Sequence, residues 1–282
     1  MEIKLAKTAG FCFGVERAVD LTLKTLEKEE KVYTWGPVVH NEAVIGDLKE
    51  KGAVVFDPKD DIDTIPEGSA VVLRAHGVTR ALEESLQIRG LKVVDAVCPF
   101  VKKIHLIVKK HSEDGEFIVI TGDENHPEVQ GIIGWVNGDY AVIVSEEEEE
   151  LKKIPEDRKI CLVSQTTFQL NKFKKIVAKI KEKNYNAYIA DTVCSATRER
   201  QEESAAIARE ADVMLVIGSK TSSNSQKLYH ICKEQCSHTY FIQSQEDLKQ
   251  SWFLDVKCVG ITAGASTPKK IFKEVQNHVR EF

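Results

Sequence analysis

The sequence lacks the features that would place it in several common classes of protein. No apolar run is long enough to span a bilayer, and Met1 to Lys4 lack the hydrophobic region of a signal peptide, so we expect a cytoplasmic protein with no membrane partner. The net charge of −5 leaves no basic face for nucleic acid, and the densest charge run, Glu146 to Glu150, is acidic. Neither a Gly-x-Gly-x-x-Gly nor a Gly-x4-Gly-Lys-Ser/Thr fingerprint is present, which argues against a bound dinucleotide or nucleoside triphosphate. Any electrons that the protein uses would therefore come from another protein.

Compact Cys-x-x-Cys pairs are also missing, although the chain has seven cysteines. An odd number of cysteines without an export signal argues against a disulfide framework. Structural zinc sites usually draw their four ligands from such pairs, so this class of site is disfavoured too. Metal ligation of another kind, or catalysis, is left to explain some of the cysteines.

Three of the cysteines lie in a repeated motif. Asp-x-Val-Cys occurs at 95–98 and at 191–194, and a looser copy surrounds Cys12. Each cysteine precedes an amphipathic helical pattern, and 28 residues after each of them, beyond an apolar run, a polar residue follows: His40, His126 and Ser222. A second polar loop follows a second apolar run in every copy, at 74–77, 164–167 and 262–266. The repeat predicts three similar modules.

Strand-like and helix-like patterns alternate from end to end, which predicts an α/β protein with mainly parallel sheets and helices on their faces. The clearest strands are expected at 32–35, 53–56, 70–73, 117–121, 140–144, 159–164, 213–218, 239–242 and 257–262. Helices are expected at 42–51, 80–88 and 170–183 and from Pro268 onward. In parallel sheets of this kind the loops after the carboxyl ends of the strands bind ligands, and every polar loop of the repeat lies there.

We expect three small α/β lobes at residues 14–97, 98–193 and 194–282, with 1–13 as an N-terminal strand and cysteine loop. Each lobe is small for independent stability, so the lobes are expected to bury surface against one another. If they face inward as a pseudo-threefold trefoil, the three repeated cysteines become neighbours at its centre.

Three cysteines at helix starts are suited to act as thiolate ligands, because the helix dipole favours negative charge there. Zinc held by three thiolates would be a poor Lewis acid, whereas a 4Fe-4S cluster with three cysteine ligands leaves one iron open to a substrate. We therefore expect Cys12, Cys98 and Cys194 to hold such a cluster. A single cysteine at a strand–helix junction is usually a small apolar residue, so this expectation depends on the repeat. The other four are expected to be structural: Cys161, Cys232, Cys236 and Cys258.

The polar loops offer imidazole, hydroxyl and amide donors without a cluster of lysines. This set suits a compact anion such as phosphate or diphosphate at helix N-termini, although Ser, Thr and Asn also serve as simple helix caps. The candidate binding residues are His40, His76, His126, Thr166, Thr167, Ser222, Ser223, Asn224 and Ser266. Glu128 follows His126 at a helix start, where a carboxyl group could move protons. The remaining histidines, including His105 and His111, are expected at the surface.

With these residues the chain resembles the LytB/IspH family of 4-hydroxy-3-methylbut-2-enyl diphosphate reductases, the last enzymes of the non-mevalonate isoprenoid pathway. The resemblance covers essentially the whole chain through eight ordered motifs: Gly-Phe-Cys-Phe-Gly-Val at 10–15, Val-Val-His-Asn at 38–41, Ala-His-Gly-Val at 75–78, Asp-Ala-Val-Cys-Pro at 95–99, His-Pro-Glu-Val at 126–129, Gln-Thr-Thr at 165–167, Ser-Ser-Asn-Ser at 222–225 and Thr-Ala-Gly-Ala-Ser at 262–266.

The resemblance implies a 4Fe-4S cluster on the three repeated cysteines at the centre of a three-lobed α/β fold. It implies a diphosphate site on His40, His76, His126, Ser222, Ser223, Asn224 and Ser266, and proton handling near the substrate hydroxyl by Glu128 and Thr166. The predicted catalytic residues are Glu128, Thr166 and His126. The implied reaction removes the hydroxyl as water with two electrons and two protons, and gives isopentenyl and dimethylallyl diphosphates.

The electrons are implied to come from an external protein of the ferredoxin or flavodoxin type. Two other functions stay open from the residues. One is a non-enzymatic iron–sulfur sensor or diphosphate-binding protein, and the other is a zinc hydrolase built on three cysteines, which would be colourless.

Overall fold

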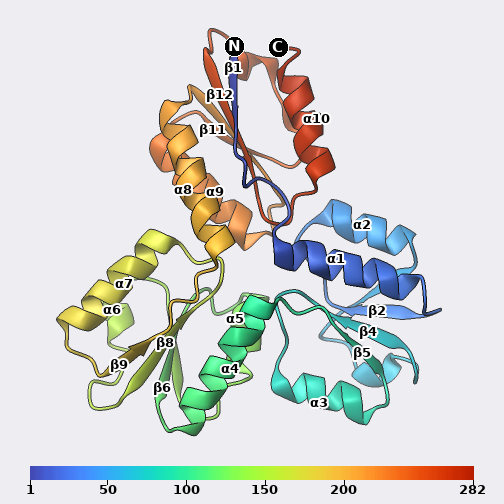
Figure 1. The fold of residues 1–282 in the computed structure, drawn as a ribbon, viewed down its shortest axis with the longest axis vertical. Helices are drawn as coiled ribbons and strands as arrows, with labels where there is room; N and C mark the ends of the chain where they lie inside the picture. Colours follow the sequence, from blue (N-terminus) through green and yellow to red (C-terminus); the bar gives the residue numbers. More distant parts are fainter. The chain divides into compact units, whose positions relative to one another are not determined.

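Three four-stranded sheets, all parallel, form the framework of the chain, and helices lie on their faces (Figure 1). The computed structural model describes all residues from 1 to 282. None of its helices has the length and hydrophobicity that a bilayer span requires. The predicted α/β class with three similar lobes is confirmed.

Each sheet is built from four short strands. The first contains β2 (Val32–Trp35), β3 (Ala53–Phe56), β4 (Ala70–Leu73) and β5 (Lys92–Asp95). The second contains β6 (Phe117–Thr121), β7 (Tyr140–Ile143), β8 (Ile160–Ser164) and β9 (Ala187–Ile189). The third contains β1 (Glu2–Leu5), β10 (Val213–Ile217), β11 (Thr239–Ile242) and β12 (Cys258–Ala263).

The order of strands is the same in every sheet. It is β3-β2-β4-β5 in the first and β7-β6-β8-β9 in the second, so the first strand of each set lies between the second and the third. The third sheet has the order β11-β10-β12-β1, and β1 takes the fourth position through its pairing with β12. The three predicted modules therefore share the same order of strands. The lobe boundaries predicted at 14–97, 98–193 and 194–282 stay a prediction.

The chain divides into two compact units. The first unit comprises Met1–Glu16, His40–Val44 and Cys194–Phe282, and it holds the third sheet and both chain termini. The second unit comprises Arg17–Val39 and Ile45–Val193, and it holds the first and second sheets.

The helices connect the strands in chain order. They are α1 (Phe13–Leu26), α2 (Glu42–Glu50), α3 (Arg80–Ile88), α4 (Pro99–Glu113), α5 (Pro127–Ile133), α6 (Glu148–Leu151), α7 (Leu170–Glu182), α8 (Ser195–Glu210), α9 (Ser223–Gln235) and α10 (Lys269–Val279). Short 3-10 turns lie at Ile62–Thr64, Gln245–Asp247 and Gln250–Phe253.

The second sheet shows why its strands are apolar on both sides. Successive side chains of a strand point to opposite faces. Phe117 and Val119 of β6 pack into a core with residues of α6 and α7, whereas Ile118 and Ile120 pack into a core with residues of α4 and α5. Because helices cover both faces, the strand is a continuous apolar run, as expected for a parallel sheet.

The third sheet is covered in the same way. Leu215 and Ile217 of β10 join a core with Val275 and Val279 of α10, and the alternate residues Met214 and Val216 join a core with residues of α8 and α9. Figure 1 shows α10 on one side of this sheet and the α8–α9 pair on the other.

The predicted strands and helices are confirmed, with ends that differ by at most one residue. Two strands of the fourth position, β5 and β9, were not predicted, because they are short and only partly buried and have no clear apolar run. The surface position expected for His105 is wrong, since this side chain is 2 % exposed. His111 is also largely covered, because it stacks on Tyr188 and contacts Glu116.

Candidate active site

Every predicted site residue lies after the carboxyl end of a strand, and each unit holds part of the set. The first unit contains Cys12, His40, Cys194, Ser222, Ser223, Asn224 and Ser266. The second unit contains His76, Cys98, His126, Glu128, Thr166 and Thr167. We describe the two sets separately.

In the first unit, Arg200 of α8 fixes the loop that carries Cys12. The guanidinium is buried and donates to the backbone carbonyls of Thr8 at 3.0 Å and Gly10 at 2.7 Å. Burial lowers the pKa of Arg200, and negative charge on the nearby groups Cys12, Cys194 and Glu203 acts in the opposite direction. A single buried cation thus lies close to two of the predicted ligands.

Glu203, almost one helical turn further along α8, holds the same loop from its other side. Its carboxylate accepts the backbone N–H of Lys7 at 2.8 Å, and the N–H and hydroxyl of Thr8 at 2.9 and 2.6 Å. Partial burial acts to raise the pKa of Glu203, but these hydrogen bonds outweigh it and the pKa is lowered. Residues Arg200 and Glu203 were not predicted from the sequence, because no local pattern links α8 to a loop some 190 residues earlier.

Hydroxyl groups connect the two polar loops of the third sheet. The Ser266 hydroxyl lies 3.0 Å from the His40 carbonyl oxygen and 3.4 Å from Ser222 Oγ. Ser222 caps α9 by accepting from the N–H and hydroxyl of Ser225 at 3.4 and 3.1 Å. The two contacts with Ser225 use the Ser222 oxygen as acceptor, and its hydroxyl proton can point to Ser266 Oγ, because the single proton of Ser266 is directed at the His40 carbonyl.

The start of α9 approaches the strand ends closely because two glycines allow it. A Cβ at Gly264 would lie 1.9 Å from Ser225 Oγ, and one at Gly218 would lie 2.3 Å from the same atom. Asn224, in the first turn of α9, is 5 % exposed, and its Nδ2 is buried without a hydrogen-bond partner. A buried amide donor at a helix N-terminus fits an anion oxygen.

In the second unit, Cys98 is joined to the loop that carries His76. The Cys98 N–H donates to the Ala75 carbonyl at 3.0 Å. The turn is closed by the Gly77 N–H on the Arg74 carbonyl at 3.0 Å and by Arg74 Nε on the Gly77 carbonyl at 3.2 Å. Gly77 has a φ of +80°, a conformation that favours glycine.

Glu128 and Thr166 meet across the two central strands of the second sheet. Glu128 Oε1 accepts the Thr166 N–H at 2.6 Å, and Oε2 accepts the Thr166 hydroxyl at 2.8 Å. Both residues are buried, with Glu128 only 2 % exposed. Since Glu128 follows β6 and Thr166 follows β8, the pair lies where the strand order reverses, which is the usual ligand crevice of such sheets.

His126 completes this group. Its Nδ1 accepts the Glu128 N–H at 3.1 Å, so in the neutral ring the proton lies on Nε2, which can donate to an anion. The rings of His126 and His76 are 5.5 Å apart in an edge-to-face arrangement. The structure therefore brings together His76, His126, Glu128 and Thr166 within one unit. Thr167 accepts from the Gln165 side chain at 3.1 Å in the same loop.

His105 packs against the loop that carries His76. Its ring stacks on Trp135, with centroids 5.2 Å apart, and Trp135 Nε1 donates to the Val78 carbonyl at 2.9 Å. A Cβ at Gly77 would lie 2.6 Å from His105 Cε1. Burial lowers the pKa of His105 to about 4, so the ring is a neutral packing group at physiological pH.

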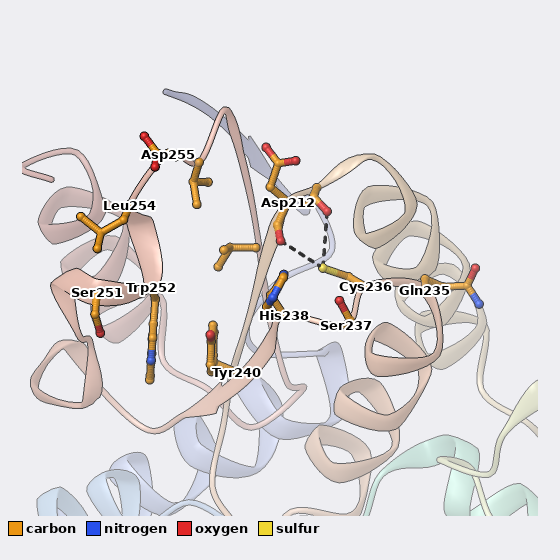
Figure 2. A pocket seen from close by; sticks show the side chains of 13 residues that line it. Asp212, Gln235, Cys236, Ser237, His238, Tyr240, Ser251, Trp252, Leu254 and Asp255 are labelled. Atoms are coloured by element: carbon orange, nitrogen blue, oxygen red, sulfur yellow. Dashed lines mark hydrogen bonds between the residues drawn. The ribbon is translucent and has the colours of Figure 1, made fainter.

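A pocket of about 580 Å³ lies at the amino ends of the strands of the third sheet, away from their carboxyl ends, and contains none of the predicted site residues. Its lining comes from residues near the amino ends of β10, β11 and β12, among them Asp212 and His238. Figure 2 shows Tyr240 and Trp252 in this pocket, and their stacked rings lie 3.9 Å apart. The Cys236 thiol is directed at the carbonyls of Ala211 and Asp212, which agrees with its predicted structural role. The pocket is therefore separate from the predicted chemistry.

Comparison with known proteins identifies the family. The profile of the LytB protein family matches residues 3–280. The chain belongs to the LytB family. A 4-hydroxy-3-methylbut-2-enyl diphosphate reductase of Geobacter sulfurreducens is 43% identical over 282 residues, which cover 100% of this chain and 98% of that protein. The resemblance predicted from the motifs is confirmed.

Two solved structures of LytB-family reductases are similar over nearly the whole chain. The structure of (E)-4-hydroxy-3-methyl-but-2-enyl diphosphate reductase, the terminal enzyme of the non-mevalonate pathway, is 39% identical, covers 100% of both chains and superposes with a TM-score of 0.71. The E-1-hydroxy-2-methyl-but-2-enyl-4-diphosphate reductase from Plasmodium falciparum is 27% identical, with a TM-score of 0.90, and the match covers 98% of this chain and 87% of that one.

Replacement of Arg200 tests its hold on the Cys12 loop of this LytB-family chain. Arg200→Met removes the donors to two buried carbonyls, so we expect the free energy of unfolding to fall by roughly 2 kcal/mol. Hydrogen exchange at residues 6–12 should become faster. Arg209→Met on the same helix is the control, because Arg209 is exposed and bonds only to the Gln235 side chain. Equal effects of the two changes on exchange at 6–12 would contradict the assignment.

Replacement of Gly77 tests the packing of the His76 loop on His105. Gly77→Ala adds a methyl group 2.6 Å from His105 Cε1 to an already positive φ. The matched control is Gly115→Ala, which has a φ of +79° and open space around it. We expect the first change to lower the free energy of unfolding by about 1–3 kcal/mol more than the second. Denaturation curves that coincide would show that the contact with His105 is unimportant.

Proposed function

We propose that this chain removes the hydroxyl group of 4-hydroxy-3-methylbut-2-enyl diphosphate as water, with two electrons and two protons, and yields isopentenyl and dimethylallyl diphosphates. This is the last step of the non-mevalonate isoprenoid pathway. The observation that carries the proposal is the buried Glu128–Thr166 pair beside His126, in a chain 43% identical over its whole length to a reductase of this substrate. The comparisons confirm the predicted activity at the level of the family, and they do not favour the sensor alternative.

Proteins of this family contain an iron–sulfur cluster, and the cysteines of this chain are suited to bind one. The three repeated cysteines are partly exposed, whereas the other four are buried. Cys98 and Cys194 occupy the N-cap positions of α4 and α8, and neither side chain accepts a capping hydrogen bond. Each of these two cysteines thus lies next to the positive end of a helix dipole, which favours a thiolate there. We infer that Cys12, Cys98 and Cys194 are the ligands and that one iron stays open.

When bound, such a cluster would supply electrons one at a time and a Lewis-acidic iron for the substrate hydroxyl. Residues of the chain would bind the diphosphate and deliver the proton. The diphosphate would be held by neutral donors, namely His40, His76, His126, Ser222, Ser223, Asn224 and Ser266, with Thr167 beside them. The buried Asn224 Nδ2, which has no hydrogen-bond partner, supports this part of the proposal.

Glu128 and Thr166 would deliver the proton that turns the hydroxyl into water. The Thr166 hydroxyl can accept a proton from a protonated Glu128 while it gives its own proton to the leaving oxygen, because a hydroxyl both donates and accepts. The burial of the pair keeps bulk water from competing for that proton. His126 orients Glu128 through the hydrogen bond to its backbone N–H.

The two electrons would come from an external protein of the ferredoxin or flavodoxin type. The chain shows no dinucleotide fingerprint that would let it draw them from a bound nicotinamide. The cytoplasmic location expected from the sequence stays a prediction.

Glu128→Gln tests the proton route. The amide can still accept the Thr166 N–H, but it cannot supply an acidic proton, so we expect turnover to fall by about 100-fold or more while substrate binding and the iron–sulfur spectrum persist. Turnover is measured anaerobically with a reduced viologen as electron source. Thr166→Ser, which keeps the hydroxyl, should retain most of the activity. Near-normal turnover of Glu128→Gln would remove this residue from the mechanism.

Cys98→Ser tests the ligand set. We expect the anaerobically purified protein to be brown and this variant to lose or degrade its cluster, as measured by iron and sulfide content and by the visible spectrum. Cys161→Ala is the control, since Cys161 is buried inside β8, and it should keep the cluster. A colourless unmodified protein would favour the zinc alternative, and an intact 4Fe-4S spectrum in Cys98→Ser would refute the ligand assignment.

A further inference from the structure

Helix α4 of the second unit presents an unusual exposed face. Val101, Ile104, His105 and Val108 are buried; Ile104 and Val108 pack in the core of the second sheet, and Val101 packs in that of the first. The opposite side carries Phe100, Lys103, Leu106 and Lys110, at a spacing that places them along one stripe of the helix. Phe100 is 46% exposed and Leu106 is 63% exposed. We call these four residues the α4 face.

The α4 face is basic in an acidic chain. The helix contains four lysines and one glutamate, whereas the whole chain has a net charge of −5. Two of the lysines have carboxylate partners, because Lys102 pairs with Asp95 and Lys109 lies 4.0 Å from Glu113. Lys103 and Lys110 form no ion pair, so their charges are available to a partner.

Another basic helix of the same unit shows that charge alone does not define this face. Helix α7 has five lysines, of which Lys175 pairs with Glu146 and Lys179 with Glu182. It exposes no large hydrophobic residue. Helix α4 combines two unpaired lysines with two exposed apolar side chains on one stripe, which is the composition of a protein-binding surface with an apolar centre and a charged rim.

The position of α4 connects this face to the proposed chemistry. The helix begins directly after Cys98, and at about 1.5 Å of rise per residue Leu106 lies roughly 12 Å from Cys98 along the axis. The face from Phe100 to Lys110 is then about 15 Å long, a size suited to the small, transient contacts of electron-transfer partners.

We propose that the α4 face docks an acidic iron–sulfur protein that acts as a one-electron carrier, with Phe100 and Leu106 in the contact and Lys103 and Lys110 attracting its carboxylates. This inference rests on the proposed function. Two reduced carriers each give up one electron and leave oxidised. The substrate takes up the two electrons and two protons, its C–O bond breaks, a C–H bond forms and water leaves. The lysines mainly speed the encounter, and this effect weakens as salt screens the charges.

The test uses the anaerobic holoenzyme and an acidic 4Fe-4S ferredoxin. The double variant Lys103→Glu/Lys110→Glu reverses the charge of the face, and Leu106→Ser removes an apolar contact. The matched control is Lys174→Glu/Lys181→Glu on α7, which changes the net charge by the same amount at two lysines that also form no ion pair. We measure the Kd for the ferredoxin, the ferredoxin-driven turnover, and the turnover driven by a reduced viologen, which needs no docking surface.

We expect the α4 double variant to raise both the Kd and the KM for the ferredoxin by about tenfold or more and to flatten their dependence on salt. Leu106→Ser should also raise the Kd, the α7 control should stay close to the unmodified protein, and viologen-driven turnover should change by less than about twofold in all variants. If the two double variants bind ferredoxin equally, the proposal is overturned. The proposal is also overturned if the α4 double variant still binds the ferredoxin normally but no longer binds vesicles of anionic lipid.

The outcome separates this inference from the proposed function. Absence of viologen-driven turnover in the unmodified, cluster-loaded chain would contradict the function, whatever the ferredoxin does. The ratio of the two double variants' Kd values is measured without turnover, so it decides the docking face in either case.

Discussion

The parallel direction of all strands is the constraint on which the rest of the structure depends. In each sheet the first strand lies between the second and the third, so the connections that leave the first and third strands run in opposite directions. A crevice results at their carboxyl ends. In the second sheet the Glu128–Thr166 contact spans this crevice, and in the third sheet the Ser266–Ser222 contact does so. The same reversal of strand order thus places a carboxyl and a hydroxyl group together in one sheet and two serine hydroxyls, which belong to the proposed diphosphate site, in the other.

The fourth position of each sheet determines where the cysteines lie. Cys98 follows β5 and Cys194 follows β9, and each opens the next helix. The third sheet has no later strand to fill this position, so β1 occupies it and Cys12 follows β1. The looser motif at Cys12 is consistent with this origin, because its strand comes from the other end of the chain. Arg200 and Glu203 then provide the long-range contacts that hold this loop to α8.

The parts of the fold that have a local, repeated sequence pattern could be predicted from the sequence. Apolar runs predicted the central strands, and the constant spacing from each cysteine predicted that His126 and Ser222 occupy equivalent loops. The short edge strand β9 was missed because three partly exposed residues carry too little periodicity. His105 was misplaced although a signal existed, since it shares the apolar stripe of α4 with Val101, Ile104 and Val108. No local signal could have found Arg200, because its partners are carbonyls distant in the sequence.

The two binding surfaces inferred for this chain differ in their physical basis. The predicted diphosphate donors are imidazole, hydroxyl and amide groups, several of them buried, and hydrogen bonds of buried groups are little affected by dissolved salt. The α4 face depends instead on two solvent-exposed lysines, whose attraction extends over about a Debye length of 10 Å and falls as ionic strength rises. A substrate held by neutral, desolvated donors and a carrier attracted by exposed charge would therefore respond independently to salt. Selection for faster electron delivery could then act on α4 without altering the affinity of the site for its substrate.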